Sequence, residues 1–229
     1  ATVATGFKGG GINPFPAVKA LVLPFGPEKL TNYEIGLKSD FLDNRLRFNL
    51  TGFYDKYKGV QLTSFDVSAY NVAFGSIVLN AGNATMKGFE AELTGEPAPG
   101  LEFDAALSYL DFHFDYINPG TGLAPYIVPP FAPAWKWSIG AQYKFDLGGS
   151  TLTPRVDVSY QSHIFTNANN APTSRIDAYT LTNASLTWAN DSRDLSVSLH
   201  VNNLFNKYYF LNNFDLTATS GLVEGFPDR

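Results

Sequence analysis

Carboxylates and loop aromatics are the residues best suited to chemistry in this sequence, because the usual catalytic groups are few. Cysteine is absent, and the three histidines, His113, His163 and His200, are far apart in the sequence. No two of them have the spacing of metal ligands, so we expect no protein metal site. The sequence contains no GxSxG elbow and no phosphate-cradling loop, and nothing in it brings a serine, a histidine and an acid together, so an enzyme is not predicted.

Two glutamates, Glu34 and Glu90, stand out among the acids because each lies on the polar side of an alternating segment. Carboxylates in such positions can accept charge-assisted hydrogen bonds from arginine. The competing interpretation is a salt bridge along the same wall, to Lys38, Arg45 or Arg47. The other charged residues of the polar sides are expected to line the wall; they are Glu92, Glu102, Asp104, Arg155 and Asp157.

Aromatic and amide side chains are frequent in the segments expected to form long loops, where they would suit a siderophore, a porphyrin or a glycan. The residues proposed as ligand-binding candidates are Tyr70, Tyr126, Phe131, Asn169, Tyr209, Asn212 and Phe214. Loop packing is the competing interpretation for each of them. Prolines would stiffen the loop that carries Tyr126 and Phe131, and they are Pro125, Pro129, Pro130 and Pro133.

The composition favours a β-sheet protein. The 229 residues include 19 Phe and 12 Tyr, and 45% are hydrophobic; these aromatics favour strands and interfaces. A net charge of -5 argues against a nucleic-acid partner. The mean hydropathy of -0.08 is compatible with a membrane barrel, because its strands alternate apolar and polar residues.

Apolar and polar residues alternate with period two in several long segments, which indicates strands. We expect about nine strands, long enough for tilted membrane crossings and longer than most globular strands. Their predicted ranges are 1–8, 29–41, 44–62, 78–96, 101–114, 133–147, 150–163, 176–190 and 193–206.

The connections between these strands alternate between short and long, as in outer-membrane barrels with periplasmic turns and extracellular loops. The tight turns are expected at 41–44, 96–100, 146–150 and 189–193, and the long loops at 9–28, 65–77, 112–133, 163–175 and 207–229. No signal peptide opens the chain and the last expected strand ends on the long-loop side, so we expect further residues upstream and one closing strand after Arg229. Aromatics expected in the interfacial girdles are Tyr57, Trp135, Trp188, Tyr208 and Tyr209.

Five motifs, in order along nearly the whole chain, resemble the TonB-dependent outer-membrane receptors. They are GFKGGGIN at 6–13, PEK and YEIGLK within 27–38, NAGNA and KGFEAEL within 80–93, YTLTNA at 179–184, and VNNLFNKYY at 201–209. The resemblance implies an all-β, antiparallel transmembrane β-barrel of roughly 22 strands. Residues 1–229 would be one partial domain, the C-terminal portion of that barrel, without the plug and without the final strand.

The same resemblance implies a function in the outer membrane of a Gram-negative bacterium. Such a receptor is surrounded by outer-membrane lipid and takes up a scarce small-molecule ligand. The TonB–ExbB–ExbD complex energises uptake through the receptor's own N-terminal plug domain. By resemblance, Glu34 and Glu90 would pair with plug arginines. A ferric siderophore is the ligand most frequent in the family, ahead of heme, cobalamin and carbohydrate, and no cofactor is implied.

Other classes of protein remain open at this point. A passive porin-type channel would share the strand pattern but have no plug. A barrel-borne enzyme is disfavoured by the lack of a placed catalytic group, and a soluble β-sandwich binding module by the strand length. We expect the isolated chain to be unstable as a soluble monomer, because its outer strands would expose long edges.

Overall fold

The computed structural model describes residues 1–13, 19–64, 76–192, 194–216 and 222–228. Nine strands follow one another in the main sheet: β1 (Thr2–Lys8), β4 (Glu28–Phe41), β5 (Leu46–Ser64), β6 (Ile77–Ala98), β7 (Leu101–Ile117), β8 (Trp135–Tyr143), β10 (Ser150–Gln161), β13 (Tyr179–Asn190) and β14 (Ser196–Val201). A short strand, β9 (Phe145–Asp146), also pairs with β10. Every one of these pairings is antiparallel.

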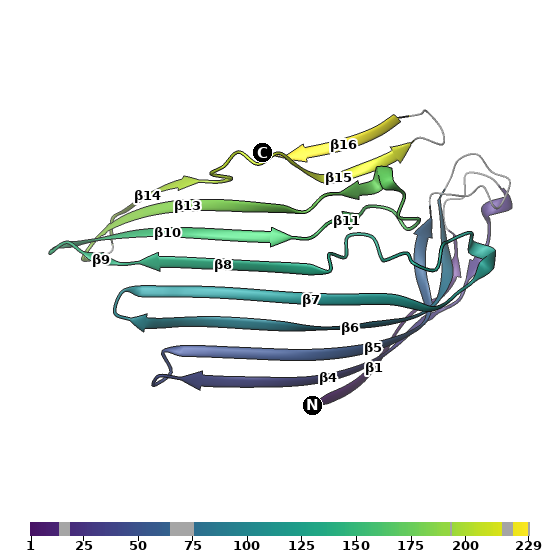
Figure 1. Ribbon diagram of the computed structural model, residues 1–229, viewed down its shortest axis with the longest axis horizontal. Helices are drawn as coiled ribbons and strands as arrows, with labels where there is room; N and C mark the ends of the chain where they lie inside the picture. Colours follow the sequence, from purple (N-terminus) through teal and green to yellow (C-terminus); the bar gives the residue numbers. More distant parts are fainter. Residues whose placement is uncertain (14–18, 65–75, 193, 217–221, 229) are drawn as a thin grey trace.

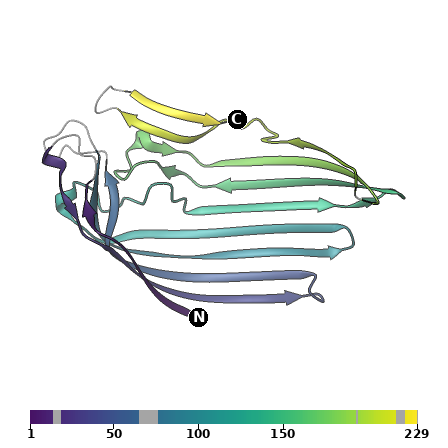
Figure 2. The ribbon, with the colours of Figure 1, turned by 180° about the vertical axis from the view of Figure 1, so that it is seen from behind.

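The strands form a single curved layer in the order in which they occur in the chain (Figures 1 and 2). Neighbouring strands in sequence are therefore neighbours in the sheet, as in an up-and-down barrel wall. No second sheet packs face to face on this layer among the described residues. The β-sandwich alternative is therefore wrong, because a sandwich needs two stacked sheets with a core between them.

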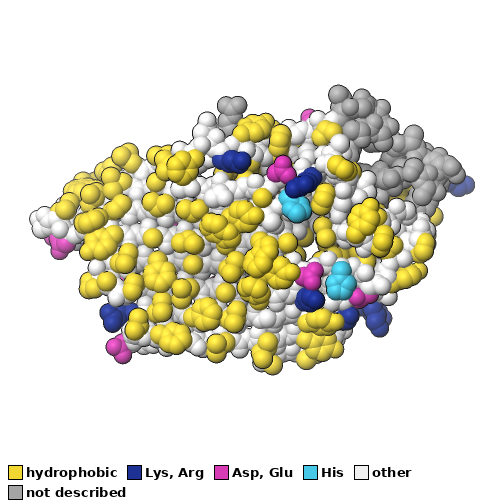
Figure 3. Space-filling model, in the orientation of Figure 1, with side chains coloured by type: hydrophobic (Ala, Val, Ile, Leu, Met, Phe, Trp, Pro, Cys, Tyr) yellow, Lys and Arg dark blue, Asp and Glu magenta, His cyan; other side chains and the backbone are white. Residues whose placement is uncertain are grey.

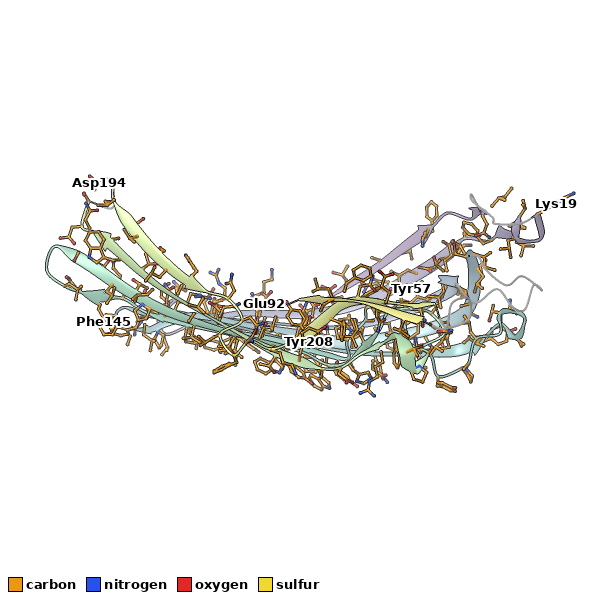
Figure 4. The ribbon with its side chains drawn as sticks, turned by 90° about the horizontal axis from the view of Figure 1, so that it is seen from above. Lys19, Tyr57, Glu92, Phe145, Asp194 and Tyr208 are labelled. Carbon is orange, nitrogen blue, oxygen red and sulfur yellow. The ribbon has the colours of Figure 1, made fainter. Side chains whose placement is uncertain are left out.

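The two faces of the sheet differ in chemistry, because the side chains of a strand point alternately to opposite faces. In β5, Phe48 and Leu50 face one side while Arg47 and Asn49 face the other. Large apolar side chains cover much of the convex face (Figure 3). Seen from above, Glu92 lies on the concave side and Phe145 on the convex side (Figure 4).

This segregation indicates whether each face contacts lipid or water. Exposed apolar side chains extend along the convex side of the sheet, as at Ile35, Ile139 and Leu199, which are 69%, 52% and 68% exposed. An apolar face of this extent would drive aggregation in water, whereas it matches lipid. No helix in the described ranges is long and apolar enough to cross a membrane.

Tight turns join the strands at one end of the sheet (left in Figure 1), as expected from the sequence. The turn between β4 and β5 places Leu42, Asp43 and Asn44 in the left-handed region, with φ of 53°, 56° and 65°. Glycines occupy that region in the next two turns, at Gly100 and Gly148, because they lack the Cβ that makes it costly.

The long connections lie at the opposite end, where they carry short elements of their own. These are β2 (Gly11–Ile12), η1 (Lys19–Leu21), β3 (Pro24–Phe25), η3 (Pro119–Thr121), β11 (Ile164–Phe165), η4 (Pro172–Ser174), β12 (Arg175–Ile176), β15 (Tyr209–Leu216) and β16 (Leu222–Asp228). The buried apolar cluster of the chain also lies here, where Leu21 and Ile127 from the connections pack with Val60, Ile77 and Phe114. The loops are thus folded onto the ends of β5, β6 and β7.

The sequence predicted the nine strands correctly, and the differences are local. β14 ends at Val201 rather than near residue 206, because Asn203 and Asn206 take left-handed conformations with φ of 49°. The segment from residue 207, expected as a loop, contains the β15–β16 hairpin.

Two girdle assignments are wrong. Tyr57 belongs to the concave face and packs against the buried cluster (Figure 4). Tyr209 packs on Tyr179, with 4.5 Å between the ring centroids, and the register places Tyr179 on the concave face, away from the lipid.

Candidate functional site

Glu34 and Glu90 both face the concave side of the sheet, as the alternation predicts. Glu34 lies opposite Thr2 and Phe53, and Glu90 lies opposite Thr51 and Ser108. Their strands, β4 and β6, are separated by β5 alone, so the carboxylates are about 10 Å apart across the sheet and about 7 Å along it. One partner of modest size could therefore contact both carboxylates.

Both carboxylates are exposed and, within the described ranges, have no hydrogen-bond or ion-pair partner. The wall salt bridges considered from the sequence do not form here, because Arg47 instead donates its Nε to Asp40 at 2.9 Å and Arg45 donates to the backbone of Leu42. The two glutamates thus keep their full acceptor capacity for a group arriving from the lumen.

A glycine lies next to each of the two glutamates on its own strand, while the ring of Phe53 lies opposite Glu34. Gly36 follows Glu34 on the same face, and Gly88 precedes Glu90 there. A hollow of about 270 Å³ adjoins Glu90, and Ser108 and Lys136 contribute to its lining. The two glycines leave each carboxylate open along its own strand, and both glutamates are exposed on the concave side.

The other polar residues of the concave wall are mostly paired with one another. Arg155 of β10 donates to Asp104 of β7 at 2.8 Å and to Asp157 through its Nε at 3.0 Å. Gly140 of β8 lies between these three side chains, and a Cβ at this position would meet the Arg155 guanidinium. Asn49 donates to Glu92 at 3.3 Å, and Gln142 donates to Glu102 at 2.9 Å. These groups hold the wall together, whereas Glu34 and Glu90 do not.

The loop candidates differ in what they are free to contact. Tyr126 is 82% exposed and Phe131 is 51% exposed, with Phe131 held in a left-handed conformation at φ 58°. Asn169 is exposed, but its side chain accepts a hydrogen bond from the backbone of Ala171 and so shapes its own turn. Tyr126 is therefore the described candidate whose side chain is most available to a ligand.

The remaining candidates are less accessible or lie outside the described residues. Tyr209 packs on Tyr179, and Asn212 lies opposite Phe226 within the β15–β16 hairpin. Tyr70 falls in the range 65–75, outside the described residues, and the side chain of Phe214 is likewise not described.

The histidines are dispersed in the fold as well. His113 lies against Asp115 on the convex side, with 3.2 Å between Nε2 and the carboxylate, and His163 packs edge to face on Phe165. His200 faces the lumen from β14, opposite Ser185. No group of three or more His, Asp or Glu side chains within the described ranges could hold a metal ion.

Several asparagines have a structural role that the sequence did not reveal. Asn80 donates to the carbonyls of Gly26 and Gly59 and accepts from the Gly26 amide, which ties the entry to β4 onto β5 and β6. Asn13 exchanges hydrogen bonds in the same way with the backbone of Val78. The NAGNA motif that contains Asn80 was noted for its resemblance alone, and that resemblance was the only available signal.

Two further asparagines join the long connections to one another. Asn170 accepts from the Val128 amide at 2.7 Å and donates to its carbonyl at 3.0 Å. Asn213 of β15 accepts a hydrogen bond from Thr166 and donates to the carbonyl of Thr173 at 3.1 Å. Three consecutive long connections are therefore linked to one another, and the exposed Tyr126 lies on the first of them.

The sheet is an open antiparallel wall with an apolar convex face and a polar concave face, and it has short turns at one end and folded loops at the other. These features define a segment of an outer-membrane β-barrel. A family model described as TonB dependent receptor-like, beta-barrel, matches residues 1–204. The chain belongs to this family of outer-membrane receptors.

Named relatives agree with this assignment. The chain is 28% identical over 203 residues to the ferripyoverdine receptor of Pseudomonas aeruginosa, covering 85% of this chain and 23% of that protein. It is 29% identical over 211 residues to the pesticin receptor of Yersinia enterocolitica, covering 90% and 29%. The chain thus spans less than a third of the length of these relatives.

Solved structures show the same fold. The ferric yersiniabactin uptake receptor of Yersinia pestis superimposes with a TM-score of 0.78 at 23% identity, over 99% of this chain and 32% of that one. The ferric preacinetobactin receptor of Acinetobacter baumannii gives a TM-score of 0.67 at 21% identity, over 98% and 31%.

Proposed function

We propose that this chain supplies part of the barrel wall and part of the extracellular vestibule of a receptor that takes up a ferric siderophore. The observation that carries the proposal is the family match over residues 1–204, together with a relative named as the ferripyoverdine receptor. The rest of the barrel and an N-terminal plug would complete the receptor. The TonB–ExbB–ExbD complex would act on that plug.

The two glutamates give this proposal a mechanism on the concave wall. Glu34 and Glu90 are exposed carboxylates without partners in the described ranges, whereas the neighbouring wall carboxylates accept hydrogen bonds; these are Glu92, Glu102, Asp104 and Asp157. Arginines of a plug would donate charge-assisted hydrogen bonds to them and hold the plug in the closed position. Force on the plug would break these two contacts and release it.

The linked extracellular connections support ligand capture. Asn170 and Asn213 fix the backbones around them, so the loops lose little conformational entropy when a ligand binds. Tyr126 would offer an aromatic face on this surface, where the aromatic ring of a catecholate siderophore could pack.

The test of the proposed function is uptake in the native bacterium. We expect deletion of the gene to abolish uptake of one radiolabelled ferric siderophore and to slow growth under iron limitation. A panel would include pyoverdine-type, phenolate–thiazoline, catecholate and hydroxamate siderophores, with heme and cobalamin as non-siderophore ligands.

Complementation separates the outcomes. The intact gene should restore uptake, and dissipation of the proton-motive force should remove it again. Unchanged uptake of every ferric siderophore in the deletion strain would refute the siderophore assignment. Loss of heme uptake alone, or of cobalamin uptake alone, would identify that molecule as the ligand in place of a siderophore. Uptake that persists without proton-motive force would favour the passive channel.

A further inference from the structure

A group of lysines interrupts the apolar convex face near its long-loop end. Lys29 of β4 and Lys58 of β5 are register partners, so they lie directly opposite each other. Each shares the face of an outward aromatic of its own strand, Tyr33 or Tyr54. Like charges at directly opposed positions destabilise a sheet, and within the described ranges neither ammonium group has a carboxylate within 4.0 Å.

Two more lysines of this face continue the group onto the next strands. Lys56 lies two positions before Lys58 on β5, and its Nζ is 2.7 Å from the Thr85 hydroxyl and 3.4 Å from the Asp115 carboxylate. Lys87 of β6 lies 3.4 Å from Asp111 of β7. Four lysines thus stand against two aspartates, and the uncompensated charge is at Lys29 and Lys58. Figure 3 shows charged side chains gathered at this end of the face.

An aromatic band lies next to the lysines on the side toward the short turns. Tyr33 and Tyr54 approach to 6.3 Å between centroids, and Tyr109 lies 4.5 Å from Trp135. Phe89 joins them, with its ring 5.9 Å from that of Tyr109. Amphipathic rings of this kind sit at the level of lipid headgroups, so the lysines lie at or just outside the lipid–water boundary of the outer leaflet.

Beyond the aromatic band, the convex face contains an apolar hollow of about 340 Å³. Ala91 of β6 and Ala105 of β7 form part of its lining, between the larger side chains of Phe48, Leu107 and Ile139. Ala91 is four residues from Lys87, which is about 13 Å along the strand. A chain that starts at the lysines would therefore reach the hollow by crossing the aromatic band.

We propose that this part of the convex face binds one phosphate-bearing lipid of the outer leaflet. Its phosphates would lie between Lys29 and Lys58 and against Lys56 and Lys87, and one acyl chain would fill the hollow at Ala91. Phosphate oxygens would neutralise the opposed ammonium groups. The acyl chain would cover apolar surface that neighbouring side chains leave unfilled.

The order of the three features selects a lipid over other anions. Free phosphate would use the lysines but neither the aromatic band nor the hollow. An acidic protein partner would have to enter the acyl region to reach Ala91, where its backbone would be without hydrogen-bond partners. A lipid meets all three requirements in the sequence in which they occur along β6.

The test uses the full receptor in detergent, with lipid binding measured by native mass spectrometry. The probe is a purified bisphosphorylated, multiply acylated glucosamine disaccharide, compared with its dephosphorylated form and with inorganic phosphate. The variants are Lys29→Gln, Lys58→Gln and their combination. The matched control is Lys38→Gln, because Lys38 is a lysine of the same strand as Lys29 on the concave face.

We expect each neutralised lysine to weaken binding of the bisphosphorylated lipid by about fivefold, and Lys38→Gln to leave it unchanged. The dephosphorylated lipid should bind weakly to every form. Ala91→Leu, which fills the hollow, should weaken lipid binding without altering the response to inorganic phosphate. Equal lipid binding by all variants would overturn the proposal, and so would equal competition by inorganic phosphate.

A charge reversal separates lipid binding from a purely structural role. Lys58→Glu would place a carboxylate opposite Lys29 and replace a repulsive pair by an attractive one. In lipid-free detergent we therefore expect the variant to be at least as thermally stable as the wild type. The same variant should lose the bisphosphorylated lipid. If Lys58→Glu unfolds the barrel in detergent, Lys58 is structural and the proposal is wrong.

Discussion

The side chain of Asn80 and the backbone of Gly26 exchange two hydrogen bonds. The Gly26 amide donates to the Asn80 carbonyl oxygen at 2.6 Å, and the Asn80 amide donates back to the Gly26 carbonyl at 3.0 Å. A third bond runs from Asn80 to the Gly59 carbonyl at 2.8 Å. One side chain thus fastens the segment before β4 to the bulged part of β5. Gly26 is 54 residues away from Asn80 in the sequence.

Asn80→Ala should therefore loosen this end of the wall. We expect a loss of about 1–3 kcal/mol in the local free energy of opening, because backbone groups of Gly26 and Gly59 lose their partner. Hydrogen exchange followed by mass spectrometry would show faster exchange around Gly26 and unchanged exchange in β10. Asn202→Ala is the matched control, since Asn202 is exposed and has no hydrogen bond within the described ranges. Equal protection in both variants would show that the Asn80 bonds contribute nothing.

Gly88 of β6 is required by close packing rather than by an unusual backbone angle. A Cβ at this position would meet the carbonyl oxygen of Tyr109 on β7 and approach the ring of Phe53 to 2.8 Å. Backbone cannot move aside without separating two strands, so Gly88→Ala should cost about 1–3 kcal/mol or more. We expect a smaller folded fraction in the outer membrane, measured by heat-modifiable migration on gels.

The control for Gly88 is another strand glycine. Gly6 of β1 has no heavy atom within 4 Å of a Cβ built on it. Gly6→Ala should therefore assemble like the wild type. Wild-type assembly of Gly88→Ala would mean that β6 and β7 are spaced more widely in the membrane.

The proposed plug contact predicts a permeability change. Replacing both Glu34 and Glu90 by Gln removes the charge but keeps the shape, and each lost charge-assisted bond is worth about 1.5–3 kcal/mol. We expect the plug to open more often and the outer membrane to become more permeable to a large hydrophilic antibiotic. Growth inhibition in liquid culture measures this directly.

Glu92→Gln serves as the comparison, because Glu92 faces the same lumen but already accepts a hydrogen bond from Asn49. It should leave antibiotic sensitivity unchanged. Sensitivity that rises equally in Glu92→Gln and in the double variant would assign the effect to wall stability. Unchanged sensitivity in the double variant would remove Glu34 and Glu90 from the plug contact.

The alternation of residue types was sufficient to predict the nine strands and the face of the acidic residues singled out on them. Period two is a local property, so Glu34 and Glu90 could be assigned to the concave face without knowing their neighbours. The girdle assignment of Tyr57 went against this rule. Tyr57 has the same parity as Arg47 and Asn49, so the alternation predicts the concave face for it. Its position near a strand end was instead taken to indicate a girdle.

Register and long-range contacts could not be predicted in this way. That Lys29 lies opposite Lys58 depends on the pairing of β4 with β5, which the turn at 42–45 sets residue by residue. The bonds made by Asn80, Asn170 and Asn213 join segments that are distant in the sequence, and an asparagine in a loop has no pattern that names its partner. The site was therefore predictable on the strands and not in the loops.

Tyr126 provides the direct test of the vestibule. Its side chain is 82% exposed on the connection that Asn170 anchors, so replacing it removes little packing from the folded protein. We expect Tyr126→Ala to assemble normally and to bind the siderophore identified by the uptake panel about tenfold more weakly, because truncated aromatic contacts commonly cost more than 1 kcal/mol. Quenching of intrinsic fluorescence by the ferric ligand would give the dissociation constants.

Tyr143→Ala is the control, because Tyr143 is an exposed tyrosine near the short-turn end, packed on Phe145. If Tyr126→Ala lost its affinity only together with its fold, Tyr126 would be a structural residue. If Tyr126→Ala and Tyr143→Ala bound the ligand equally well, the ligand contact would lie in another part of the linked loops.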